Sequence, residues 1–302
     1  VGLLAAAIGA VYPLFLYIPL TMYPESLLIY LFGAAGLLMY SLRKRMRLSV
    51  LLALSVLLGV AVMIRPTSVI WIPVAIGYVA LRRGQGFRRA IVVASLLFLI
   101  PAAFAGGWMA RNKVVHDRFT FSVTGAGTLL STFNENQRGQ AKINRLPERI
   151  VQRLKETEGP DRERVYMEEV TSFIREHPVW AVRNVAMQCL QTWNPIPQTH
   201  TKGGFAGQRY KTIVALPYAF LLLLGIVGIL IERRDSLVRV LLCLMVINTV
   251  INAIFSVSVR YRVVTDFGFL IPAALAIGVA IWGRAKIRPD LGNPHVIQDG
   301  TQ

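Results

Sequence analysis

The chain of 302 residues is poor in charged side chains, and acidic ones are the scarcest. Only 16% of its residues are charged, and 33 lysines and arginines stand against 16 aspartates and glutamates. Hydrophobic residues make up 54% of the chain, and its mean hydropathy is +0.52. So little charge excludes an ordinary soluble domain and indicates a multi-pass membrane protein.

Cysteine and histidine are also scarce. Cys189 lies in a polar region and Cys243 in an apolar run, so we expect no disulfide between them, and the redox compartment is not indicated. The four histidines are scattered without metal-ligand spacing. There is no P-loop, dinucleotide-binding glycine pattern or Ser-His-Asp arrangement. We therefore predict no cofactor and no dedicated metal site; a divalent cation is an open alternative that no residue pattern supports.

The basic residues are concentrated in short links between apolar runs. Fourteen lysines and arginines lie in 43–47, 82–89, 232–239 and 284–288. The opposite short links carry only Arg65, Arg260 and Arg262, and long loops are exempt from the count. This is the positive-inside pattern rather than a nucleic-acid-binding face, despite the net charge of +17. We expect both ends of the chain in the cytoplasm of a bacterial cell, and the protein in its plasma (inner) membrane.

Eight apolar runs are candidates for membrane helices. They are roughly residues 2–20, 26–42, 49–64, 68–81, 90–110, 211–231, 238–257 and 264–282. The sequence thus predicts an all-α polytopic membrane protein with about eight transmembrane helices. Residues 1–110 would hold the first five helices and 211–283 the last three. Between them, 111–210 would form an extracytoplasmic loop domain, and 284–302 a cytoplasmic tail.

The long loop mixes several local patterns. Residues 119–133 predict a short strand, a turn around Gly125 and Gly127, and a second short strand or irregular piece. A helix is expected over 147–156, a second one capped by Asp161 and ending at His177-Pro178, and a third, amphipathic one over 179–193. Trp180 and Trp193 near its ends favour helices lying on the membrane surface. The alternative is a small outer domain packed on itself.

Ionisable residues near the membrane are costly, so each one is a functional candidate. Glu25 lies in a short outer link, where a carboxylate could orient a hydroxyl, hold a cation or assist a base. It could equally be an acid that favours the dipole of the following helix. Arg65, in another short link, could fork onto a lipid phosphate or merely extend to the headgroups.

Two further polar groups are predicted on the same face. Arg111-Asn112 ends the fifth apolar run, and Arg260-Tyr261-Arg262 ends the seventh. With Arg65, these arginines would make an anion site if their helices are neighbours. Asp266 lies four residues after Arg262 on one helical face, so the two could form a salt bridge with a purely structural role.

In order along the chain, several short motifs resemble the C superfamily of integral-membrane glycosyltransferases, the proteins similar to dolichyl-phosphate-mannose–protein mannosyltransferases. The motifs are Tyr12-Pro13, Tyr23-Pro24-Glu25, Ile64-Arg65-Pro66-Thr67, Trp108-Met109-Ala110-Arg111-Asn112, the segment 121–129, Phe173-Ile174-Arg175-Glu176-His177-Pro178 and Arg260-Tyr261-Arg262. Each is weak alone, but together they cover nearly the whole chain.

The resemblance implies transfer of a sugar from a polyprenyl-phosphate carrier to a lipid, glycan or protein acceptor at the extracytoplasmic face. It implies Glu25 as a supporting acid, and Arg65, Arg111, Arg260 and Arg262 as donor-phosphate ligands. Asn112, Tyr261 and Asp266 would support them. The family's first outer loop, with its main acid, has no counterpart here, and the chain begins with a valine inside an apolar run. We therefore expect a fragment that is inactive by itself.

Two other functions are compatible with the sequence. A flippase for lipid-linked sugars, or another transporter, would place polar residues through the centres of its helices; Asn248 and Asn252 are the main such pair, and we expect them to bond across helices. A scaffold whose loop binds a partner is the third possibility. Membrane lipids are expected partners in every case, and nucleic acid in none.

Overall fold

The computed structural model describes residues 1–20, 23–80, 86–121, 125–136, 146–157, 161–196, 208–255 and 259–283, without the side chains of 208–211 and 259–260. The predicted cytoplasmic tail lies outside this part. The described residues form helices and connecting segments, with no strand among them. The described part of the chain is thus all-α and of membrane type, as predicted for its apolar runs.

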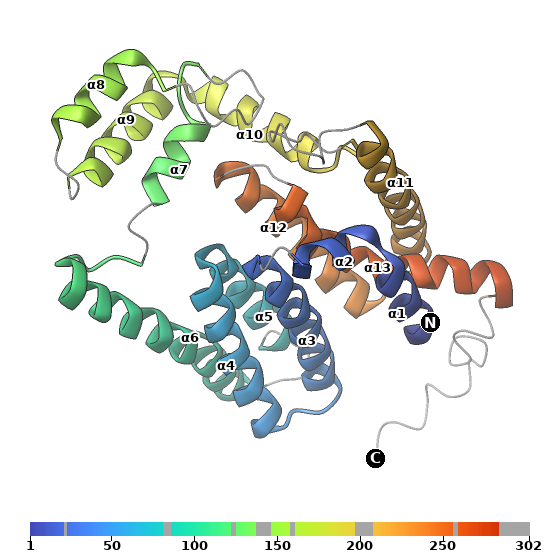
Figure 1. Ribbon diagram of the computed structural model, residues 1–302. Helices are drawn as coiled ribbons and strands as arrows, with labels where there is room; N and C mark the ends of the chain where they lie inside the picture. Colours follow the sequence, from blue (N-terminus) through green and yellow to red (C-terminus); the bar gives the residue numbers. More distant parts are fainter. Residues whose placement is uncertain are drawn as a thin grey trace.

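The N-terminal half is a set of apolar helices (Figure 1). They are α1 (Gly2–Val11), α2 (Pro13–Leu20), α3 (Pro24–Lys44), α4 (Leu48–Ile64), the 3-10 helix η1 (Pro66–Ile70), α5 (Trp71–Val79) and α6 (Phe87–His116). α1 and α2 meet at a bend of 59°. Pro13 has no N–H to continue α1, and Tyr12 before it takes the extended conformation that a following proline favours.

The C-terminal part adds three long apolar helices, α11 (Gln208–Ile231), α12 (Ser236–Phe255) and α13 (Val259–Trp282). α13 packs against α11, α12, α1 and α3, so it lies at the centre of the bundle. Glycines permit the closest of these contacts: a Cβ on Gly228 of α11 would overlap the backbone carbonyl oxygen of Pro272 in α13. In a membrane the hydrophobic effect does not drive helices together, and small residues let two helix backbones approach closely enough to pack.

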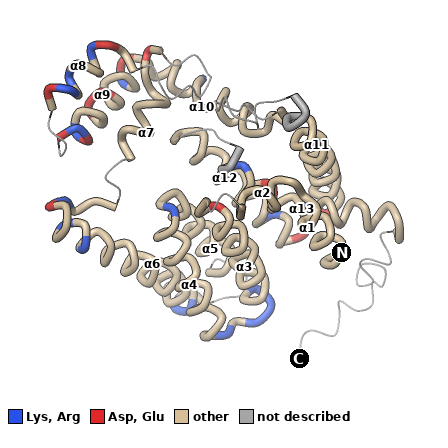
Figure 2. The backbone as a smooth tube through the Cα atoms, in the orientation of Figure 1, with Lys and Arg blue, Asp and Glu red and all other residues tan. Residues whose placement is uncertain are grey.

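Among the residues that the structure describes, five helices are long and apolar enough to cross a membrane, namely α3, α6, α11, α12 and α13, and a sixth span results if α1 and α2 count as one. The expected total of eight would require α4, with 17 residues, and the η1–α5 pair to cross as well. Figure 2 shows lysine and arginine at the link between α3 and α4, and long uncharged stretches along the helices.

The described residues of the segment between the two apolar sets form four helices at one end of the long ones (Figure 1). They are α7 (Gly125–Thr132), α8 (Glu148–Glu156), α9 (Arg162–Glu176) and α10 (Pro178–Thr192). The three helices predicted after residue 146 are confirmed. Asp161 does occupy the N-cap of α9, but its side chain makes no capping hydrogen bond.

The predicted strands of 119–133 are wrong for the residues that the structure describes there. Gly125–Thr132 is helical. Ala126, Leu130 and Phe133 follow at helical spacing, and all three are buried. Leu130 and Phe133 join a small core with Val165 and Val170 of α9. Burial on one helical face therefore overrode the local preference of threonine and phenylalanine for strands.

These four helices combine the two arrangements considered for the loop. Ile150, Leu154 and Phe173 complete the small core, as expected of a domain packed on itself. Trp180 packs edge-on against Phe173, with ring centroids 5.0 Å apart. α10, however, leaves an apolar stripe uncovered, including Val179, Val182 and Leu190. That stripe has the character of a helix lying at a membrane surface.

Candidate functional site

Glu25 and Arg65 form an ion pair between two membrane helices. Arg65 Nη1 donates to Glu25 Oε1 at 3.1 Å, and the two side chains are 15% and 5% exposed. Glu25 lies in the first turn of α3, which Pro24 opens. Arg65 lies between α4 and η1, where Pro66 imposes an extended backbone on it. Two separate Pro-containing helix starts thus bring the opposite charges together.

Tyr261, near the start of α13, covers the arginine of this pair. The guanidinium carbon lies 3.7 Å from the centroid of the Tyr261 ring, a cation–π contact. The hydrogen bond to the carboxylate and the contact with the ring together hold the guanidinium in place. Glu25, Arg65 and Tyr261, three of the residues predicted for one site, therefore do converge.

A cavity of 560 Å³ opens beside Arg65 and Tyr261. The membrane helices and their links supply Arg65, Pro66, Thr67, Thr120, Phe255 and Tyr261 to its wall, and α7 and α9 supply Gly125, Ala126, Thr128, Leu129, Glu163 and Met167. Its volume falls within the range of small-molecule sites, which are mostly apolar with a few fixed polar groups. The cavity is thus a candidate site between the apolar helices and the loop helices.

Glu163 is a cavity residue that the sequence did not indicate. It lies in the first turn of α9, and its Oε1 accepts a hydrogen bond from the backbone N–H of Ala126 at 2.7 Å. The carboxylate therefore holds the start of α7 while it lines the cavity. No local pattern could reveal this contact, because its two partners are 37 residues apart.

Glu25 has one more property of a functional carboxylate. Its Oε2 is buried and has no hydrogen-bond partner among the described residues. Buried carboxylate oxygens are normally satisfied, so such an atom calls for a ligand or a role. A hydroxyl or a water would provide the missing hydrogen bond.

Arg262 and Asp266 belong to a different cluster. Arg262 Nε lies 3.5 Å from Asp266 Oδ1, which confirms the predicted pair, and the two side chains are 2% and 0% exposed. The Tyr12 hydroxyl donates to Asp266 Oδ2 at 2.8 Å, and Arg262 Nη1 donates to the Asn194 carbonyl at 2.7 Å. These bonds tie α13 to the link between α1 and α2 and to the segment that follows α10. The geometry favours the structural alternative for this pair.

Arg111 and Asn112 also lie apart from the cavity wall. Arg111 is exposed at the end of α6, where its Nη1 donates to Asn112 Oδ1 at 3.0 Å. Asn112 is buried, and its Nδ2 donates to the Thr120 carbonyl at 2.9 Å. Since Thr120 lines the cavity, Asn112 supports its wall indirectly. The Arg260 side chain lies outside the described residues, so of the four predicted phosphate ligands only Arg65 is placed beside the cavity.

Metal ligands are not gathered anywhere in the described part of the chain: no three His, Cys, Asp or Glu side chains there form a group that could hold an ion. Asn248 Nδ2 of α12 donates to Thr265 Oγ1 of α13 at 3.0 Å, the expected bond across helices, while Asn252 bonds within its own helix. Compared with known proteins, the chain matches no protein-family model, no curated protein and no solved structure.

Proposed function

We propose that this protein is a membrane glycosyltransferase and that the cavity beside Arg65 receives the phosphate of a polyprenyl-phosphate-linked sugar. The observation that carries the proposal is the position of Arg65. Its guanidinium, held by Glu25 and Tyr261, lines a 560 Å³ cavity where the apolar helices meet the loop helices. A lipid-linked sugar suits this position, because its phosphate lies between an apolar tail and a polar sugar, as the cavity lies between the apolar helices and the loop helices. The resemblance of the motifs to the C superfamily supports the same reading.

The chemistry of such a donor explains why one oriented arginine would matter. An acceptor hydroxyl oxygen attacks the anomeric carbon, the bond from that carbon to the phosphate oxygen breaks, and the electron pair leaves with the phosphate. Negative charge therefore grows on the phosphate in the transition state. A pre-oriented guanidinium in a poorly hydrated site stabilises that charge without reorganisation.

The two carboxylates have different roles in this proposal. The proton of the attacking hydroxyl must pass to a base. Glu25 is paired with Arg65 but is not part of the cavity wall, so its partnerless Oε2 would receive that proton through a water rather than directly. Glu163 lines the cavity from α9 and would orient acceptor hydroxyls. We place the cavity at the extracytoplasmic face of the plasma membrane, because the basic links lie at the opposite helix ends.

A transfer assay tests the proposal. The full-length protein, reconstituted in liposomes, is given a radiolabelled polyprenyl-phosphate sugar, and transfer to lipid, glycan and protein acceptors is measured. Arg65→Lys keeps the charge but loses the forked geometry and the flat stacking face, so we expect a 10²- to 10³-fold slower transfer, roughly the loss of one oriented donor.

The matched control is Arg164→Lys on α9, whose side chain is 72% exposed and does not line the cavity. It should leave transfer unchanged. Equal rates for wild type and Arg65→Lys would remove Arg65 from the phosphate site. Movement of the intact donor across the bilayer without transfer would instead establish the flippase.

A further inference from the structure

A second cavity lies at the other ends of the membrane helices, away from the pair formed by Glu25 and Arg65. Its volume is 430 Å³, and its wall comes from the end of α3, most of α5 and the first three turns of α12. Arg43, in the last turn of α3, is 18 residues from Glu25 at the start of the same helix. We call this cavity the basic groove. Its wall comprises Arg43, Pro73, Val74, Gly77, Tyr78, Ser236, Arg239, Val240, Cys243 and Ile247.

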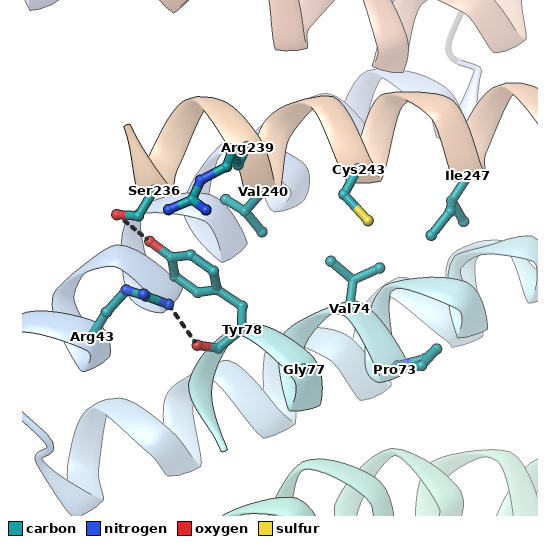
Figure 3. Close-up of a pocket in the computed structure, with 10 residues that line it drawn as sticks. All are labelled: Arg43, Pro73, Val74, Gly77, Tyr78, Ser236, Arg239, Val240, Cys243 and Ile247. Atoms are coloured by element: carbon teal, nitrogen blue, oxygen red, sulfur yellow. Dashed lines mark hydrogen bonds between the residues drawn. The ribbon is translucent and has the colours of Figure 1, made fainter. Parts of the chain in front are cut away.

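The polar side chains of the basic groove gather at one end. Figure 3 shows Arg43, Arg239, Tyr78 and Ser236 together there. The Tyr78 hydroxyl donates to Ser236 Oγ at 3.2 Å, and Arg43 Nη1 donates to the Tyr78 carbonyl at 3.4 Å. The guanidinium carbon of Arg43 also lies 4.8 Å from the centroid of the Tyr78 ring. Three helices are thus joined around two arginines.

The other end of the basic groove is apolar. Val240, Cys243 and Ile247 follow one face of α12 away from the arginines, with Val74 and Pro73 of α5 opposite them (Figure 3). The Cys243 side chain is exposed, so this end opens at the surface of the bundle. Where helices cross a membrane, that surface faces lipid tails.

The acid nearest to the basic groove in sequence is occupied elsewhere. Asp235 Oδ1 accepts hydrogen bonds from the backbone N–H groups of Leu237 and Val238, at 2.8 and 3.2 Å. The carboxylate thereby caps α12, and it is not part of the groove wall. The charged side chains of the wall itself are both cationic.

We propose that the basic groove binds an anionic phospholipid, with the headgroup phosphate between Arg43 and Arg239 and one acyl chain along Val74, Cys243 and Ile247. Charge complementarity selects this occupant: two guanidiniums and a serine hydroxyl suit a phosphate, and the adjoining wall offers nothing polar to a soluble anion. Basic pockets between membrane helices on the side of the positive links favour such headgroups. The site is independent of the proposed sugar transfer, because it lies at the opposite helix ends.

Cys243 makes the proposal measurable, because an acyl chain in the groove would cover its sulfur. The purified protein in neutral detergent is treated with a maleimide, with added phosphatidylglycerol or with added phosphatidylcholine, and each cysteine is followed by peptide mass spectrometry. Phosphatidylglycerol should slow labelling of Cys243 at least fivefold more than phosphatidylcholine does, on the scale of one guanidinium–headgroup contact. Cys189 on α10 is the internal control; burial raises the pKa of its thiol, so less reactive thiolate forms at a given pH, and neither lipid should change its rate.

Variants separate the headgroup contact from general coverage by lipid. Arg239→Gln removes an exposed charge at the groove, and it should lower the protection by phosphatidylglycerol about fivefold. Arg47→Gln, an exposed arginine in the same set of links but not in the groove wall, should keep full protection. Because both positions are exposed, neither change should impair folding, which a thermal unfolding curve checks. Equal protection by both lipids, full protection in Arg239→Gln, or protection by inorganic phosphate alone would overturn the proposal.

Discussion

At the scale of single residues, the ion pair of Glu25 and Arg65 dominates the candidate site. Both groups are largely withdrawn from water, and withdrawing two charges costs several kcal/mol before their attraction offsets it. Such a pair contributes little net stability, although it makes each partner depend on the other. Its presence beside a cavity therefore points to a function rather than to a contribution to folding.

Because each charge depends on the other, we expect that the effects of replacing Glu25 and Arg65 on the free energy of unfolding do not add. Arg65→Met leaves the Glu25 carboxylate buried without its partner, so we expect it to lower the free energy of unfolding by about 3–5 kcal/mol. The double variant Glu25→Gln/Arg65→Met removes both charges and should recover most of that loss. Thermal unfolding of the single and double variants in detergent measures the coupling. Additive losses would mean that the two charges do not depend on each other.

Some of the site residues could be predicted from the sequence, and others could not. Glu25, Arg65 and Tyr261 could be predicted because charged and aromatic residues are rare at the ends of apolar runs. That Arg262 would pair with Asp266 followed from their spacing of four. Which arginine faces the cavity could not be predicted, because the surroundings of Arg65 and Arg262 depend on the side chains that distant helices bring to them. Glu163 was missed for the same reason.

At the scale of the elements, hydrophobic runs predicted helices well. Every apolar run corresponds to a helix or a pair of helices, with ends shifted by a few residues. The prediction failed at 119–133, where Leu130 and Phe133 found their partners on α9, more than thirty residues away. Helix existence depends on local periodicity, whereas the choice between helix and strand in a short segment depends on what covers it.

The contact between α11 and α13 provides a test at this scale. Gly228→Ala would place a methyl group on the Pro272 carbonyl, so the helices must separate, and we expect a loss of about 1–3 kcal/mol in the free energy of unfolding. Gly106→Ala in α6 is the matched control, because a Cβ there meets nothing within 4 Å. It should leave stability unchanged or raise it by up to about 1 kcal/mol, since alanine favours helix. Thermal unfolding of both variants measures these changes. An unchanged free energy of unfolding in Gly228→Ala would mean that the two helices are not in close contact.

At the scale of the whole molecule, the chain has two differently charged ends. Arginine and lysine cluster at the link between α3 and α4, whereas α7 to α10 form a cap over the opposite helix ends (Figures 1 and 2). The cavity with Arg65 lies beneath that cap, and the basic groove lies at the other end. Such an asymmetry suits a protein that works on a lipid-linked substrate at one membrane face and is anchored to anionic lipid at the other.

The most direct test of the proposed function is to locate the donor lipid on the protein. A polyprenyl phosphate with a photoreactive group in its first isoprene unit is cross-linked to the reconstituted protein, and the labelled peptides are mapped by mass spectrometry. We predict labels on the segments that line the cavity, 65–67, 125–129 and 261, that are competed by the sugar-linked donor and lost in Arg65→Lys but not in Arg164→Lys. Labels confined to other helices, or equal labelling in Arg65→Lys, would contradict a phosphate site at Arg65.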